Sequence, residues 1–209
     1  MRSYYLILLL LTLLACNQKT VELPKLSVKG TTDLYNTSQI WFFLELNGPD
    51  TIAKVNSKNK ITNTHLIFNI DKKLRLKHII NPIQEIQEKV NASSVHKIEG
   101  MHQYFSYADT LHQEFSLFDF TDTIYMLDQD SISEANQILL VCGNEILYRD
   151  QKITLNELTK LSVEIGNDTN EIELRFCQNT LYEDYLFVLT TLKQCNVPTR
   201  KGQVIISKE

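Results

Sequence analysis

The stretch IELRFCQNTLYEDYLFVLTTLKQCNV (residues 172–197) contains a change of period that decides the fold. Residues 172–176 alternate apolar and polar side chains, which is typical of a half-buried strand. Three polar residues follow, and Thr180 and Glu183 stand at the spacing of a capping box at the start of a helix. The stretch therefore predicts a strand, a polar turn and an amphipathic helix with apolar positions Leu181, Tyr185, Val188, Leu189 and Leu192.

The segments on either side complete a small domain. Residues 137–152 contain two strand-like runs around the turn Gly143-Asn144, and residues 154–161 form a second amphipathic pattern that begins with the capping-box pair Thr154 and Glu157. The run from Gln203 to Ser207 predicts a closing strand. We therefore expect residues 135–209 to form a two-layer α+β domain of order ββαβαβ, bounded by the polar segment 128–135.

The half of the chain before this boundary predicts a second domain of the same class, over residues 38–128. It begins with a hairpin signal around Asn47-Gly48-Pro49-Asp50, followed by a strand that ends at Asp71. Asn81-Pro82 predicts the start of a helix, since proline is tolerated at the first helical position. An aromatic region, residues 104–120, predicts another hairpin. The fold class is thus α+β, with two small two-layer sheet-plus-helix domains.

The two halves align with each other at an offset of 106 residues. This shift places apolar residues on apolar residues in both the strand and the helix. Two interpretations remain open at this point: a diverged internal repeat, or the chance similarity of any strand followed by an amphipathic helix. The aligned pairs are Phe68 with Leu174, Ile70 with Phe176, Leu76 with Tyr182, Ile79 with Tyr185, Ile83 with Leu189 and Ile86 with Leu192.

The N-terminus carries a targeting signal. Arg2 precedes an apolar run from Leu6 to Leu14, which is shorter than the roughly 20 residues that a membrane-spanning helix needs. The tetrapeptide at residues 13–16 resembles a bacterial lipoprotein signal, whose cysteine is acylated before cleavage. We expect residues 1–15 to be a lipoprotein signal peptide, Cys16 to carry the lipid, and residues 16–37 to be a polar tether.

The strand and helix at residues 172–197, with the hairpin and helix before them, resemble the periplasmic domain of the ExbD/TolR biopolymer-transport family. The resemblance covers about 70 C-terminal residues, and the matching positions are Arg175, Tyr182, Glu183, Val188, Leu189, Leu192 and Gln194. Cys177 stands where the family has an acidic residue, and the family's N-terminal transmembrane helix is missing. The resemblance therefore implies periplasmic docking and dimerisation, without proton-driven work.

Composition and motifs argue against several other classes of function. The net charge is −4, or −5 once Arg2 is removed, and no basic patch accompanies it, so we expect no nucleic-acid partner. No catalytic, cofactor-binding or metal-binding motif stands out, and we expect no catalytic residues, no cofactor and no metal. After acylation three cysteines remain, which we expect to be buried apolar residues able to form at most one disulfide: Cys142, Cys177 and Cys195.

Together these features predict a non-enzymatic lipoprotein of the bacterial cell envelope that faces the periplasm. It would be an adaptor or accessory of an ExbD/TolR-type membrane transport or energy-transduction complex. Expected partners are the membrane, through the lipid anchor, envelope transport-complex proteins and a second copy of the chain. The candidate interaction edge is the closing strand, at Gln203, Ile205 and Ser207. The alternative is a lipoprotein that binds a glycan or another ligand through the aromatic hairpin 104–120, and a hydrolase is a third interpretation.

Overall fold

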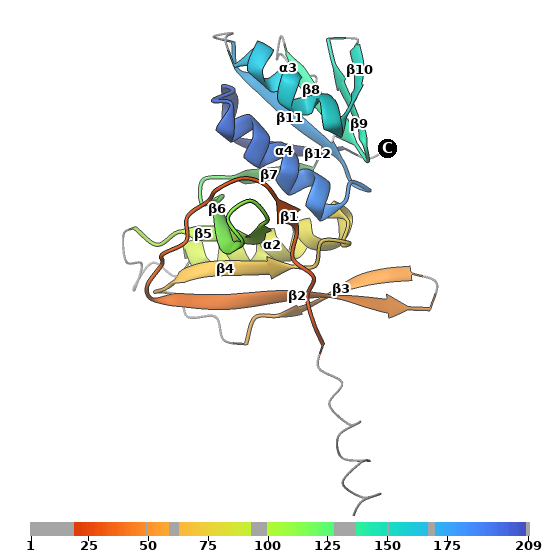
Figure 1. Cartoon of the computed structure of the whole chain (residues 1–209). Coiled ribbons are helices and arrows are strands. Elements are labelled where there is room, and N and C mark those ends of the chain that lie inside the picture. The colour runs from red at the N-terminus through yellow and green to blue at the C-terminus, as the bar shows by residue number, and fades with distance from the viewer. Residues whose placement is uncertain are drawn as a thin grey trace, which may run out of the picture.

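The computed structural model describes residues 19–48, 50–58, 63–92, 100–127, 137–149, 151–166 and 170–207. In these ranges the chain forms two six-stranded mixed sheets and three α-helices (Figure 1). The expected α+β class, with two small sheet-plus-helix units, is confirmed. None of the helices in the described residues is long and apolar enough to cross a membrane.

The first unit contains one sheet and one long helix. Its elements are β1 (Lys25–Leu26), β2 (Thr37–Asn47), β3 (Asp50–Asn56), β4 (His65–Ile70), α2 (Leu76–Ala92), β5 (Gln103–Asp109) and β6 (Glu114–Asp119).

The second unit begins earlier than the sequence predicts. Strand β7 precedes the expected boundary at 128–135 but pairs in parallel with β12 of the second sheet. The remaining order matches the expected ββαβαβ, with one additional short strand, β10. The elements are β7 (Ile124–Leu127), β8 (Ile138–Cys142), β9 (Glu145–Tyr148), β10 (Gln151–Thr154), the 3₁₀ turn η1 (Leu155–Glu157), α3 (Leu158–Ile165), β11 (Ile172–Cys177), α4 (Tyr182–Gln194) and β12 (Thr199–Ser207).

The two sheets share one strand order. The first runs β3-β2-β4-β5-β1 and the second β9-β8-β11-β12-β7, and in each the hairpin strand is antiparallel while the other four are parallel. Helices α2 and α4 begin at residues 76 and 182, which differ by the offset of 106 found in the sequence. The units differ in their additions, because β6 extends the first sheet while β10, η1 and α3 are inserted in the second.

A backbone bridge joins the two units at the turns that precede α2 and α4. Leu76 N donates to Thr180 O at 3.0 Å, and Tyr182 N donates to Leu74 O at 2.8 Å. A second pair links Lys77 N to Gln178 O at 2.9 Å and Glu183 N to Lys72 O at 3.3 Å. In each pair the two donors are equivalent residues at the offset of 106, and so are the two acceptors, while the donating unit and the accepting unit change places. The units are therefore related by a local pseudo-two-fold axis.

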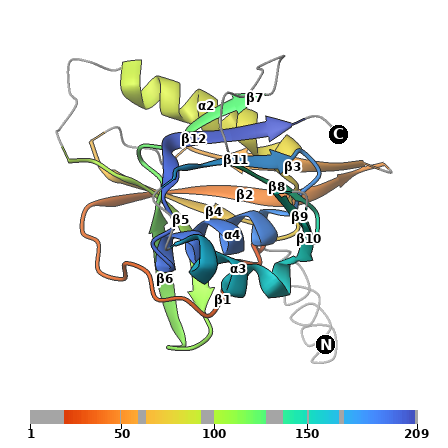
Figure 2. The ribbon, with the colours of Figure 1, turned by 90° about the horizontal axis from the view of Figure 1, so that it is seen from above.

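Helix α4 lies between the two sheets (Figures 1 and 2). Eight of its 13 residues are buried, and they face more than one side of the helix. The Tyr185 ring contacts Phe176 of its own sheet, with 4.9 Å between centroids, and Tyr182 contacts Phe105 of the other sheet at 5.6 Å. The buried apolar residues of both units therefore form one continuous core.

The proline signal predicts that helix α2 starts at Pro82. The helix begins six residues earlier, at Leu76. The apolar stripe begins with Leu76 and Ile79, both fully buried, so packing against the sheet outweighs the hydrogen bond that an internal proline removes. Pro82 itself is only partly buried. Leu76 is equivalent to Tyr182, the first residue of α4, at the offset of 106.

The expected tether is wrong in its extent, because most of residues 19–36 dock onto the fold. Glu22 is hydrogen-bonded to the turn after β4, with Lys72 N donating to Glu22 O at 2.8 Å. Strand β1 pairs with β5, and Leu26 is 3% exposed. Thr31 and Leu117 exchange backbone hydrogen bonds at 3.1 and 2.9 Å. The backbone N–H and C=O groups of this segment, for which the sequence predicts no regular element, thus form hydrogen bonds with β5 and β6.

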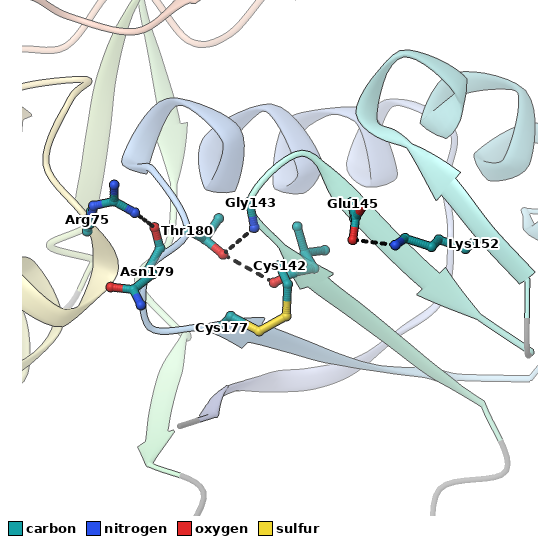
Figure 3. The surroundings of a disulfide bond; sticks show 9 residues. Arg75, Cys142, Gly143, Glu145, Lys152, Cys177, Asn179 and Thr180 are labelled. Atoms are coloured by element: carbon teal, nitrogen blue, oxygen red, sulfur yellow. Dashed lines mark hydrogen bonds and ion pairs between the residues drawn. A yellow bond between two sulfur atoms is a disulfide. The ribbon is translucent and has the colours of Figure 1, made fainter. Parts of the chain in front are cut away.

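A disulfide joins the ends of neighbouring strands β8 and β11, between Cys142 and Cys177, whose Cα atoms are 4.9 Å apart (Figure 3). The chain thus forms one disulfide, the largest number that the sequence allows, and only Cys195 is a free thiol in the described residues. The matching position in the first unit is Asp71, whose carboxylate accepts from Glu22 N at 3.2 Å and Lys73 N at 3.0 Å. Equivalent sites thus fasten the chain by different chemistry.

We expect the Cys142→Ser, Cys177→Ser double variant to lose about 2–4 kcal/mol of unfolding free energy, because the bond closes a 35-residue separation in the unfolded chain. Urea unfolding of the variant and of the reduced wild type should give similar midpoints. Cys195→Ser is the control and should cost less than about 1 kcal/mol. A double variant as stable as the oxidised wild type would contradict this assignment.

Candidate functional site

The residues that the sequence singles out do not gather at one site. Cys16, the expected acylation site, lies outside the described residues. The expectation that the closing strand is a free edge is wrong for Gln203 and Ile205, because β7 pairs with β12 from Gln203 to Ile206. Ile205 is only 4% exposed. Ser207 pairs with Cys177 on the other side of β12.

The edge that β7 forms is itself partly covered. The side-chain amide of Gln84 donates to the backbone carbonyl of Tyr125 at 2.9 Å, and that of Gln87 donates to the carbonyl of Thr123 at 3.3 Å. Both glutamines belong to α2 of the first unit. Covering an edge in this way discourages pairing with another strand, so this side of the second sheet is poorly suited to docking by strand addition.

The aromatic hairpin predicted as an alternative binding surface is mostly core. Tyr104, Phe105, Tyr107 and Phe120 are at most 6% exposed. The rings of Phe105 and Phe120 stack with 3.7 Å between their centroids. These rings cannot provide an open platform for a glycan. Phe118 keeps partial exposure, and it faces a cleft between the two units.

The junction cleft, as we call it, consists of two adjoining hollows of about 350 and 300 Å³. Phe118 and Asp119 at the end of β6, and Lys193 near the end of α4, line both. The larger hollow continues to the start of β12, and the smaller one to the N-terminal segment at residues 28–31. The remaining polar lining side chains are Lys29, Thr31, Thr123, Thr190, Gln194, Asn196, Thr199, Arg200 and Gln203.

The charges of the junction cleft are predominantly positive, although the chain as a whole is negative. Lys29, Lys193 and Arg200 line it against the single carboxylate of Asp119. The Lys193 ammonium lies 4.9 Å from the centre of the Phe118 ring, a favourable cation–π geometry. The Arg200 guanidinium is 3.4 Å from Glu173. A cleft with this lining favours an anionic group in its ligand.

Asp119 is held in its charged form. Burial acts to raise the pKa of Asp119, but hydrogen bonds from Thr121 and His102 outweigh burial and place this pKa below its ordinary value. Thr121 N donates to Oδ1 at 2.9 Å, and His102 Nδ1 lies 2.7 Å from Oδ2. The carboxylate of Asp119 therefore stabilises the turn after β6 through hydrogen bonds at both oxygens. The cationic side chains are the groups of the cleft that can bind an anionic ligand.

Two glycines allow the close backbone approaches that shape the junction cleft. A Cβ atom on Gly30 would lie 2.5 Å from both Leu117 O and the Tyr107 hydroxyl. Gly202 has φ +71°, and a Cβ atom there would collide with Asp122 O. The Tyr107 hydroxyl donates to Val28 O at 3.0 Å, and burial raises the pKa of Tyr107 to about 12. These contacts fix the N-terminal segment as one wall of the cleft.

The β5–β6 turn brings together three side chains that the sequence did not single out as metal ligands: Asp109, His112 and Glu114. The Asp109 carboxylate accepts from Leu111 N at 2.8 Å and His112 N at 3.2 Å, and it lies 2.6 Å from His112 Nδ1. These bonds are those of an aspartate that stabilises a turn. We therefore assign the cluster a structural role.

The sequence could not have revealed the junction cleft as a site. Lys29, Phe118 and Lys193 come from segments far apart in the chain, and no short motif links them. The lysines read as ordinary solvated charges, and Phe118 as one strand aromatic among several. Gln203 was singled out for an edge, and it lines this cleft instead.

The architecture and the junction cleft are the basis for assigning a function to this chain. No protein-family model, curated protein or solved structure matches it.

Proposed function

We propose that this protein is a lipid-anchored component of the bacterial cell envelope that faces the periplasm. It is a non-enzymatic adaptor or accessory of an ExbD/TolR-type membrane transport or energy-transduction complex. The signal-like tetrapeptide ending at Cys16 supports the anchor. The Cys142–Cys177 disulfide supports an oxidising compartment such as the periplasm, since disulfides are uncommon in the reducing cytosol.

The observation that carries the proposal is the pair of similarly ordered units joined by the backbone bridge at residues 72–77 and 178–183. The resemblance of the C-terminal unit implies docking and dimerisation in the periplasm. This chain supplies two such units in a symmetric pair, so the pair forms without a second copy. Lipid on Cys16 would hold the pair at the membrane, where a transmembrane helix holds the family members.

The junction cleft is the docking site in this proposal, because it exists only where the two units and the N-terminal segment meet. Ligand sites are commonly found at such junctions. The positive lining from Lys29, Lys193 and Arg200 fits an acidic segment of a transport-complex protein. Electrostatic complementarity of this kind contributes mainly to specificity and to the rate of association.

The anchor is tested by Cys16→Ser. We expect this change to move the protein from the membrane pellet to the soluble envelope fraction, because the acyl chains supply the membrane affinity. The fold should persist, since residue 16 lies before the docked segment that begins near Glu22. Fractionation after a high-salt wash, with circular dichroism of the soluble variant, measures both. A variant that stays in the washed pellet would exclude acylation as the anchor.

The docking site is tested by affinity purification of the tagged full-length chain from cross-linked, detergent-solubilised envelope. We expect transport-complex subunits to co-purify with the wild type and to fall by roughly tenfold with Lys29→Glu, Lys193→Glu, because two favourable charges are reversed. Lys58→Glu, Lys160→Glu is the matched control, with the same change of net charge at exposed sites. Absence of these subunits from the wild-type sample, or equal losses in both variants, would refute the proposal.

A further inference from the structure

The β2–β3 hairpin carries apolar side chains that the rest of the fold does not cover. Its end projects beyond the neighbouring strands of the first sheet (Figures 1 and 2). Trp41 and Phe43 lie on the face directed away from the core, are partly exposed and stack with 6.4 Å between ring centroids. Ile52, on the same face, is 40% exposed, whereas Leu46, near the tip on the opposite face, is 78% exposed. We call Trp41, Phe43 and Ile52 the hairpin face.

The described chain begins beside this face. Lys19, the first described residue, forms an ion pair with Glu45 of β2. Lys54 of β3 joins the same carboxylate at 3.4 Å. Glu45 is two residues from Phe43 on β2, and Lys54 is two residues from Ile52 on β3. Residues two apart on a strand point to the same side, so Glu45 and Lys54 lie on the outer face. The chain therefore enters the fold on the side that carries the hairpin face.

The distance from this entry to Cys16 is short. Three residue steps separate Cys16 from Lys19, and a fully extended chain covers at most about 11 Å in three steps. The polar headgroup layer on one side of a bilayer is roughly 5–8 Å thick. Lipid on Cys16 would thus leave little room between the hairpin face and the membrane.

We propose that the hairpin face rests on the lipid bilayer and sets the orientation of the protein on the membrane; this inference depends on the acylation of Cys16 proposed above. Tryptophan is enriched at membrane interfaces, where its amphipathic ring meets the headgroups. Lys19 and Lys54 can extend their ammonium groups toward lipid phosphates. Glu45 and Asp50 offset their charge, so the surface suits a zwitterionic lipid. The junction cleft does not include these residues.

Trp41 reports this contact directly because it is the only tryptophan of the chain. The acylated full-length protein would be reconstituted into phosphatidylcholine vesicles, with or without phosphatidylcholine brominated near the top of its acyl chains. Intact-mass spectrometry establishes the acylation of the same sample. We expect the brominated lipid to quench Trp41 fluorescence, and the Cys16→Ser protein mixed with the same vesicles to show less quenching.

Two double variants separate contact through the hairpin face from tethering alone. Phe43→Glu, Ile52→Glu should reduce the quenching at least roughly twofold, since carboxylates are expelled from the interface. Leu147→Glu, Val163→Glu changes two exposed apolar residues of the second unit, which are 45% and 57% exposed, and should leave it unchanged. An acylated protein without quenching, or equal quenching in both variants, would overturn the orientation but not the anchor. A mass without acyl chains would overturn both.

Discussion

The enclosure of helix α4 between two sheets is the constraint on which the rest of the structure depends. A helix with one apolar stripe can be covered by its own sheet, but α4 buries eight of 13 residues on several sides. Each fully buried Val, Leu or similar side chain contributes about 1.5–3 kcal/mol, so exposing one side of α4 would remove a large part of the stability of a small unit. Phe105 of the first sheet supplies the second covering surface through its contacts with Tyr182 and Tyr185. The backbone bridge between the turns before α2 and α4 then fixes the relative position of the units.

The two units diverge where they make contact with other parts of the chain. At equivalent positions, Asp71 fastens the N-terminal segment and Cys177 forms the disulfide. The first arrangement matters for the proposed anchor, because it joins the segment that follows Cys16 directly to the turn after β4. Motion of the anchor would therefore be transmitted to the folded body over only a few residues. A long flexible tether would not do this.

The sequence predicted the elements whose signals are local, and it was less informative about the contacts between them. The change of period at residues 172–197 located β11 and α4, whereas the Pro82 signal placed the start of α2 six residues too late. Polar residues 19–36 gave no periodicity, because their hydrogen bonds go to β5, β6 and the turn at Asp71 instead of to a regular element of their own. β12 was expected at an edge, but it pairs with β7, which is only four residues long and gave too weak a signal to be recognised as its neighbour. The junction cleft depends on three distant segments and could not be derived from any one of them.

The claim that both units form one cooperative core is tested most directly by urea unfolding of Leu189→Ala. Leu189 belongs to α4 and is 8% exposed, whereas Trp41, the fluorescent probe, lies in the first unit. A shared core predicts that Trp41 fluorescence and far-ultraviolet circular dichroism give one coincident transition, destabilised by about 2–5 kcal/mol as for a truncated buried leucine. A Trp41 transition that stays at the wild-type midpoint while the circular dichroism transition moves would show that the two units unfold independently and would contradict the account.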